Sequence, residues 1–167
     1  METINNLIII IMAGGLGKRM NSTLPKVLHP IKGIPMICKI IEEANKLNPS
    51  KIFVIVGKYK KIIEETINNN NIEYIIQEEA LGTGHALLCS RNKLLNFPNH
   101  NVLILSGDVP LITSETMINI CTNPNSIVVT SLDDPKGYGR IIEDDSNRFQ
   151  KIVEEKDCND RDRKSVV

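Results

Sequence analysis

The 167-residue chain contains no tryptophan, and aromatic residues make up only 4% of it. A core with so few large rings must be built from aliphatic side chains, mainly isoleucine, leucine and valine. Lys plus Arg and Asp plus Glu each number 20, so the formal net charge is zero. Without an excess of positive charge, the composition does not support broad nucleic-acid binding or polybasic attachment to a membrane. It is the composition of an ordinary globular domain.

The four cysteines, Cys38, Cys89, Cys121 and Cys158, are not arranged for metal binding. No two have Cys-x-x-Cys spacing, and none has a histidine at a distance typical of a zinc site. We therefore expect reduced thiols in a cytosolic protein. The apolar run over residues 7–13 is too short to span a bilayer, and no basic segment precedes it as in a signal peptide. These features predict a cytoplasmic location.

Apolar periodicity predicts strands that alternate with helices along most of the chain. Strands are expected over residues 7–12, 51–56, 72–76, 102–105 and 126–131, with a terminal strand pair over 138–142 and 149–153. Helices are expected over residues 35–47, 59–67 and 84–95, and from an N-cap at Ser114 to about Cys121. This alternation is typical of an α/β protein with a mainly parallel sheet. Because such sheets bind ligands at the carboxyl ends of their strands, the loops after the first, third and fourth strands form the candidate site.

Residues 13–20 read Ala-Gly-Gly-Leu-Gly-Lys-Arg-Met and follow directly on the first predicted strand. Glycines allow backbone N–H groups to approach a ligand closely, and Lys18, Arg19 and the later Lys26 supply cations suited to a polyphosphate. A dinucleotide fingerprint matches poorly, because Met20 stands at the third glycine position and no carboxylate ends the second strand. A P-loop also matches poorly, since Arg19 stands where a serine or threonine would bind magnesium. In isolation, the loop is also compatible with a tight turn that carries solvated cations.

Two further loops follow predicted strands at the same edge of the sheet. Gln77 begins one of them, ahead of Gly82-Thr83-Gly84, and its amide offers a donor and an acceptor to the edge of a pyrimidine. Asp108 ends the sequence Ser106-Gly107-Asp108, where one carboxylate suffices for a magnesium ion that also binds phosphate oxygens. Each loop alone is compatible with a structural turn, and Asp108 also with a helix N-cap. Together the three loops favour a site for a nucleotide phosphate and magnesium.

In order and spacing, these motifs resemble those of the sugar nucleotidyltransferases, in particular the uridylyltransferase domain of bacterial bifunctional enzymes that make UDP-N-acetylglucosamine. The matching segments are residues 13–20, 24–29, 77, 81–86, 107–110, 133–141 and 152–154. The resemblance implies a three-layer Rossmann-like nucleotidyltransferase fold with a mainly parallel sheet. It also implies transfer of a uridylyl group from UTP to N-acetylglucosamine 1-phosphate, with release of pyrophosphate and with Mg²⁺ as cofactor.

The resemblance further implies a role for each matching residue. Arg19 and Lys26 would grip the triphosphate, and Asp108 would hold the metal ion. Gln77 would read the uracil, and the other nucleotide-binding residues would be Ala13, Gly14, Gly15, Gly82 and Thr83. Gly139 and Glu154 would contact the sugar phosphate. The histidines His29 and His85 are expected to be structural, because this phosphoryl transfer needs no nucleophile from the enzyme.

Alternative functions remain open from the residues alone: a relative that uses another sugar phosphate or nucleotide, an inactive nucleotide-binding fragment, and, as the poorest match, a dinucleotide-dependent dehydrogenase. The resemblance implies that a whole domain of this kind continues past the region of Lys156, with two asparagines for the sugar and the metal. Residues 162–167 are those that a common sequencing adapter encodes, and the alternative interpretation is a short protein with an ordinary charged tail. We therefore expect a partial nucleotidyltransferase domain over residues 1–161 and a non-native tail over 162–167.

Overall fold

The computed structural model describes residues 4–15, 17, 20–123, 125–146, 148–160 and 162. The chain divides into two compact units, one ending at residue 124 and one beginning at residue 125. Arg19, expected at the triphosphate, and residues 163–167 of the expected tail lie outside the described residues. No helix in the described part of the chain is both long and apolar enough to cross a lipid bilayer.

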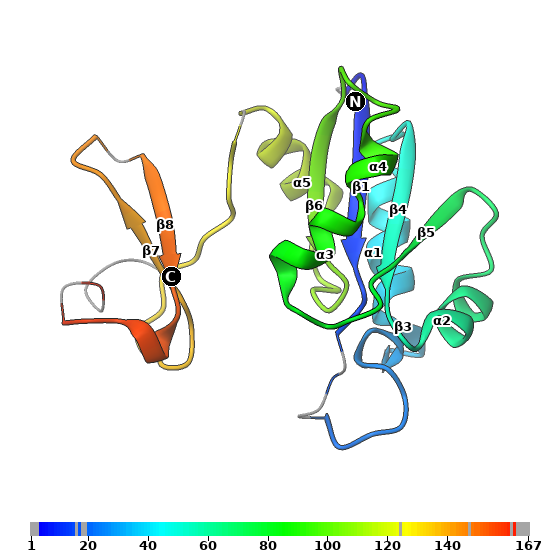
Figure 1. Ribbon diagram of the computed structural model, residues 1–167, viewed down its shortest axis with the longest axis horizontal. Helices are drawn as coiled ribbons and strands as arrows, with labels where there is room; N and C mark the ends of the chain where they lie inside the picture. Colours follow the sequence, from blue (N-terminus) through cyan, green and yellow to red (C-terminus); the bar gives the residue numbers. More distant parts are fainter. Residues whose placement is uncertain are drawn as a thin grey trace. The chain divides into compact units, whose positions relative to one another are not determined.

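A four-stranded sheet forms the centre of the first unit (Figure 1). Its strands are β1 (Leu7–Met12), β4 (Lys51–Val56), β5 (Ile72–Ile76) and β6 (Asn101–Ser106). They lie in the order β5-β4-β1-β6, and every neighbouring pair is parallel. The predicted α/β class with a mainly parallel sheet is confirmed. The bounds of β1, β4 and β5 are those expected from their apolar runs.

The strand order creates a switch point between β1 and β6. From β1 the chain moves outward through β4 to β5, and it then returns to the other side of β1 as β6. The two strands end side by side, since Met12 is paired with Ser106 in the parallel register. In open α/β sheets, the crevice beyond the strands at such a point is the usual ligand site. The topology therefore brings the glycine loop and the Asp108 loop together.

Helices cover both faces of the sheet and complete three layers (Figure 1). One face is covered by α1 (Met36–Asn45), α2 (Lys60–Ile67) and α5 (Ser114–Cys121). The other face is covered by α3 (Thr83–Cys89) and α4 (Arg91–Leu94). Alternate side chains of β1 enter the two cores, with Ile9 and Ile11 in one and Ile8 and Ile10 in the other. Burial on both faces explains why β1 is an unbroken apolar run.

Two helix predictions need correction. The helix expected over residues 84–95 is interrupted at Ser90, whose hydroxyl donates to the Leu87 carbonyl over 2.6 Å and competes with the helical ladder. The cap of α5 is Thr113 and not Ser114, because the Thr113 hydroxyl accepts from the backbone N–H of Thr116. The N–H of Ser114 donates instead to a Glu43 carboxylate oxygen. Both differences arise from side-chain hydrogen bonds that apolar periodicity does not report.

One strand prediction is wrong, and one strand pair was not predicted. The segment 126–131, expected as a fifth strand, belongs to no sheet formed by the described residues, and Ile127, Val128 and Val129 are about half exposed. Its β-branched residues favour an extended backbone, but a strand also needs a neighbour to pair with. A short hairpin, β2 (Pro30–Ile31) and β3 (Ile34–Pro35), follows the 3-10 helix η2 (Lys26–Leu28) and was not expected. Two-residue strands are too short to have a periodicity.

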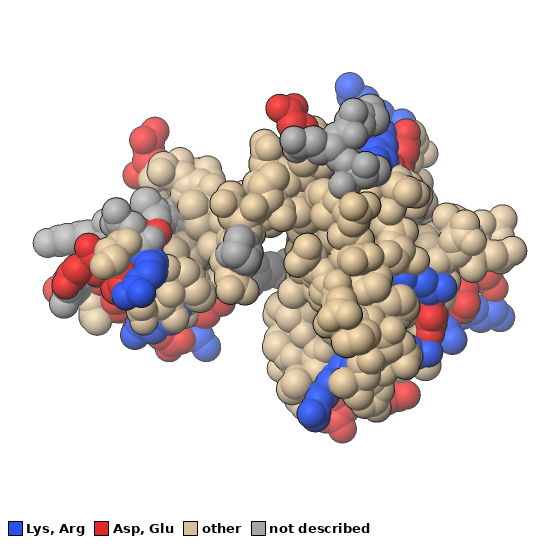
Figure 2. Space-filling model, turned by 90° about the horizontal axis from the view of Figure 1, so that it is seen from above, with Lys and Arg blue, Asp and Glu red and all other residues tan. Residues whose placement is uncertain are grey.

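Positive and negative side chains are interspersed on the surface. Around the margin of the face shown in Figure 2, Lys and Arg lie close to Asp and Glu. Glu73 pairs with both Lys51 and Lys93, and Lys60 lies 4.0 Å from Glu64 along α2. This mixing agrees with the zero net charge of the chain.

The second unit contains an antiparallel hairpin, β7 (Arg140–Glu143) and β8 (Phe149–Val153), followed by the 3-10 helix η3 (Glu155–Asp157). The predicted terminal strand pair is therefore confirmed, with β7 beginning two residues later than expected. Arg140 is only 3% exposed. Its guanidinium donates to the carbonyls of Pro135 and Tyr138 and pairs with Glu155 at 2.9 Å. One buried arginine thus ties three segments of this unit together.

Replacing Arg140 with alanine is expected to loosen the hairpin, because the Glu155 carboxylate and two carbonyls lose their common donor. Breaking a buried ion pair costs about 3 kcal/mol or more. Hydrogen exchange followed by mass spectrometry should show lost protection over β7 and β8. Arg148→Ala is the matched control, since its side chain is 77% exposed beside Asp144 and such pairs contribute under about 1 kcal/mol. Equal protection in the two variants would contradict the structural role of Arg140.

Candidate functional site

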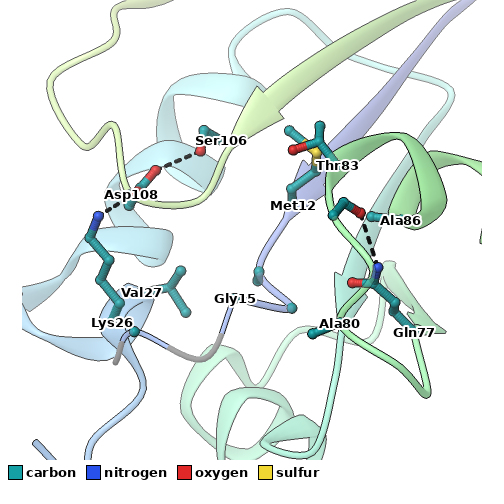
Figure 3. Close-up of a pocket in the computed structure, with 14 residues that line it drawn as sticks. Met12, Gly15, Lys26, Val27, Gln77, Ala80, Thr83, Ala86, Ser106 and Asp108 are labelled. Atoms are coloured by element: carbon teal, nitrogen blue, oxygen red, sulfur yellow. Dashed lines mark hydrogen bonds and ion pairs between the residues drawn. The ribbon is translucent and has the colours of Figure 1, made fainter. Parts of the chain in front are cut away.

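A cavity of about 480 Å³ lies at the carboxyl ends of β1, β5 and β6 (Figure 3). These are the three strands whose following loops the sequence predicts as the site. The residues that line the cavity are Met12, Ala13, Gly14, Gly15, Gly17, Lys26, Val27, Gln77, Ala80, Gly82, Thr83, Ala86, Ser106 and Asp108. All the predicted nucleotide residues, together with Lys26 and Asp108, are thus brought to one place.

The two residues expected at the sugar phosphate lie in the second unit. Gly139 directly precedes β7 and Glu154 directly follows β8. Because Arg140 pairs with Val153 in the antiparallel register, Gly139 and Glu154 lie at the same end of the hairpin. Residues fifteen positions apart in the sequence are therefore neighbours in this unit.

Gln77 forms one side of the cavity. It is 6% exposed, and its backbone N–H donates to the Val56 carbonyl at 2.8 Å, which continues the pairing at the end of β5. Its side-chain Nε2 lies 3.2 Å from the carbonyl oxygen of Gly82 and 3.1 Å from His85 Nδ1. A Cβ on Gly14 would come within 2.9 Å of Gln77 Oε1, so the glycine is what lets the amide lie against the backbone here.

A carboxylate with two donors forms the opposite side of the cavity (Figure 3). Lys26 Nζ donates to Asp108 Oδ2, and Ser106 Oγ donates to Asp108 Oδ1; each donor–acceptor distance is 2.5 Å. Lys26 and Asp108 are 82 positions apart and meet because η2 lies beside the end of β6. Burial raises the pKa of Asp108, but the hydrogen bonds from Lys26 and Ser106 outweigh it and hold that pKa below its ordinary value. The group is therefore a carboxylate at neutral pH.

The lowered pKa of Asp108 gives a pH-dependent contribution to stability. A carboxyl whose pKa is lower in the folded than in the unfolded protein stabilises the fold above the unfolded value of about 3.9, and that contribution disappears as the pH falls through the folded value. Ser106→Ala removes one of the hydrogen bonds responsible. The loss of melting temperature in Ser106→Ala should therefore be steady at neutral pH and shrink below about pH 4.

Thermal unfolding between about pH 3 and pH 8 measures this difference. Ser131→Ala is the control, since Ser131 is exposed and has no hydrogen bond to a carboxylate among the described residues. If the loss of melting temperature in Ser106→Ala instead grew as the pH fell, the pKa of Asp108 would not be lowered by the Ser106 hydrogen bond.

Sequence reasoning did not select several of the residues that line the cavity. Val27, Ala80 and Ala86 carry no polar group, so nothing in their chemistry marks them. Ser106 did carry a signal, because a hydroxyl two residues before a strand-end carboxylate is well placed to bind it. Gly17 has a φ of +58°, which favours glycine, and a Cβ there would lie only 3.2 Å from Lys26 Cβ. The absence of a side chain at Gly17 therefore leaves room for Lys26.

Comparisons with known proteins show the family to which the chain belongs. Residues 9–143 match the family model described as MobA-like NTP transferase domain. The chain is 45% identical to a probable UDP-N-acetylglucosamine pyrophosphorylase of Acanthamoeba polyphaga mimivirus, over 98% of this chain and 68% of that protein. It is 40% identical to the bifunctional protein GlmU of Clostridium botulinum, over 93% of this chain and 35% of that protein. The chain thus spans about a third of the length of the bifunctional relatives.

Solved structures share the fold. A putative glucose-1-phosphate thymidylyltransferase from Bacillus anthracis superimposes with a TM-score of 0.73 at 22% identity, over 89% of this chain and 64% of that one. HddC from Yersinia pseudotuberculosis superimposes with a TM-score of 0.65 at 25% identity, over 88% and 68% of the two chains. The sheet described above is therefore of the Rossmann-like type found in those structures.

Proposed function

Because the chain belongs to the family of nucleotidyltransferases with a MobA-like NTP transferase domain, we propose that it transfers a uridylyl group from UTP to N-acetylglucosamine 1-phosphate. The observation that carries the proposal is the cavity at the switch point. It joins an amide suited to a pyrimidine with a lysine–carboxylate pair suited to phosphates and a cation. The mimivirus relative, named a probable UDP-N-acetylglucosamine pyrophosphorylase, supports the choice of substrates.

The cavity suits an extended nucleotide. Gln77 lies on one side of it, and Lys26 and Asp108 lie on the other, with Gly15 of the glycine loop between them (Figure 3). The pyrimidine would lie against Gln77, and the triphosphate would run along the glycine loop toward Lys26. Backbone N–H groups and a lysine ammonium are the usual partners of phosphate oxygens. Arg19 would add a second cation.

The reaction itself needs no nucleophile from the protein. An oxygen of the sugar phosphate would attack the α-phosphorus of UTP, and the bond between that phosphorus and the bridging oxygen would break to release pyrophosphate. The difficulty is to bring two anions together and to neutralise the charge that develops on the leaving group. Lys26 would supply positive charge beside the phosphates. Gly139 and Glu154, at one end of the β7–β8 hairpin, would hold the sugar phosphate.

Nucleotidyltransferases of this family generally use a divalent metal ion. We propose Mg²⁺, held by Asp108. No group of three or more metal-binding side chains occurs among the described residues, so a caged ion such as structural zinc does not fit. A single carboxylate does fit Mg²⁺, which keeps several waters and takes its other ligands from the substrate phosphates. When bound, the ion would neutralise phosphate charge.

Release of pyrophosphate tests the proposal. The purified chain is supplied with Mg²⁺, with UTP, CTP or dTTP, and with N-acetylglucosamine 1-phosphate or glucose 1-phosphate. Release that needs both UTP and N-acetylglucosamine 1-phosphate supports the proposed reaction. Faster release with another pair assigns the chain to a different substrate. Binding of UTP without release from any pair contradicts catalysis and favours a nucleotide-binding fragment.

A further inference from the structure

We propose that His85 is a positioning residue, which holds the side-chain amide of Gln77 with its oxygen toward the base. The cavity then presents a hydrogen-bond acceptor to the imide N–H of a uracil and disfavours cytosine. This inference rests on the proposed function, which supplies the pyrimidine nucleotide.

The contacts of Gln77 determine which way its amide is turned. Its neighbour at 3.2 Å is the carbonyl oxygen of Gly82, and a carbonyl can only accept a hydrogen bond. The amide atom facing Gly82 must therefore be the NH₂ group. Its second N–H is directed at His85 Nδ1, 3.1 Å away, so both donors of the amide are used.

The same contact assigns the proton of His85. Because Gln77 Nε2 donates, His85 Nδ1 must accept through its lone pair, and the proton of the neutral imidazole is then on Nε2. Gly82 immediately precedes α3 and His85 lies within its first turn. One helical turn thus places two acceptors, a carbonyl and a ring nitrogen, around a single NH₂ group.

With both N–H donors of the Gln77 amide in use, its oxygen Oε1 is the group that can bind a ligand. In the described part of the chain, both hydrogen bonds of the Gln77 amide use Nε2 and none uses Oε1. Oε1 lies over Gly14, where a Cβ would come within 2.9 Å of it, and it points into the cavity (Figure 3). Gly14 also lines that cavity, so a base that enters would meet the oxygen and not the NH₂ group.

This orientation discriminates between pyrimidines at ring position 3. Uracil carries an N–H there and can donate to Oε1, whereas cytosine carries a lone pair that would face the oxygen lone pairs. Thymine has the same imide as uracil, so His85 does not distinguish the two. Without the His85 acceptor, only Gly82 would oppose rotation of the amide, and a turned amide would donate to the lone pair of cytosine.

The test compares two variants of equal shape. His85→Leu removes the acceptor, whereas His85→Asn keeps an oxygen at the same number of bonds from the backbone as Nδ1. Binding of UTP and of CTP to the whole chain is measured by titration calorimetry in Mg²⁺, and the ratio of the two affinities is the readout. His85→Leu should lower the preference for UTP by about five- to tenfold, the range expected for one lost hydrogen bond, and His85→Asn should restore most of it. His100→Leu, at a histidine that does not line the cavity, should leave the ratio unchanged.

The outcomes separate the role of His85 from the proposed function. If His85→Leu weakens UTP and CTP equally, or if His85→Asn behaves like His85→Leu, the positioning role is wrong while the proposed function stands. If the unaltered chain binds UTP no better than CTP, the reading of the base by Gln77 is wrong, and the role of His85 falls with it. If the unaltered chain binds neither nucleotide, the proposed function itself is wrong. Melting curves of each variant establish that the ratio is measured on folded protein.

Discussion

Asp108→Asn is expected to lower the rate of pyrophosphate release by roughly 10²–10³-fold, the loss typical of removing one charge-stabilising group from an active site. Asp108 is the one carboxylate among the described residues that line the cavity. The amide that replaces it keeps the size of the side chain but loses the charge that would hold a divalent ion. It also leaves Lys26 without its carboxylate partner. Turnover is measured with UTP and N-acetylglucosamine 1-phosphate.

A second readout separates loss of metal from loss of fold. Mn²⁺ binding followed by electron paramagnetic resonance should weaken in Asp108→Asn while the circular dichroism spectrum is retained. Asp145→Asn, at an exposed residue of the β7–β8 turn, is the matched control and should leave both binding and turnover unchanged. Unaltered Mn²⁺ affinity in Asp108→Asn would remove Asp108 from the metal site.

Gly107→Ala is expected to destabilise the first unit by about 2 kcal/mol or more. A Cβ at this position would lie 2.7 Å from the Met12 carbonyl oxygen and 3.0 Å from Val27 Cγ1. The same carbonyl accepts the Gly107 N–H at 2.9 Å, so the clash can be relieved only by separating the ends of β1 and β6. Because the candidate site lies at these ends, ligand binding should weaken as well. Urea unfolding measures the loss of stability.

Gly84→Ala is the control for this substitution. Apart from its chain neighbours and its own helix backbone, no described atom lies within 4 Å of a Cβ on Gly84, which is in the first turn of α3. Alanine in a helix is more favourable than glycine by about 0.5–1 kcal/mol. We expect Gly84→Ala to be as stable as the unaltered chain or slightly more stable. If Gly107→Ala unfolded at the same urea concentration as the unaltered chain, the ends of β1 and β6 could separate without loss of stability, and the prediction would be wrong.

Local patterns predicted three strands of the central sheet. The bounds of β1, β4 and β5 follow from runs of mainly apolar residues. In β1 and β4 the run is unbroken or nearly so, because parallel strands buried on both faces need apolar residues along their whole length. The same reasoning was wrong for residues 126–131, which have strand-like composition but join no described sheet. It also missed the interruption of the 84–95 helix, which depends on one hydroxyl of a fully buried serine.

The chemistry of the site could be read from the chain because it is carried by short motifs at strand ends. Glycines after β1, an amide after β5 and a carboxylate after β6 are each local features, and their types alone suggest a nucleotide, phosphates and a cation. The partners of those groups could not be read in this way. Lys26 meets Asp108, and Gln77 Oε1 lies over Gly14, only because β6 and β4 flank β1 in the sheet. The strand order depends on the burial of all four strands and on their hydrogen-bond pairing at the same time. No local stretch of sequence determines it, so these contacts exist only in the folded molecule.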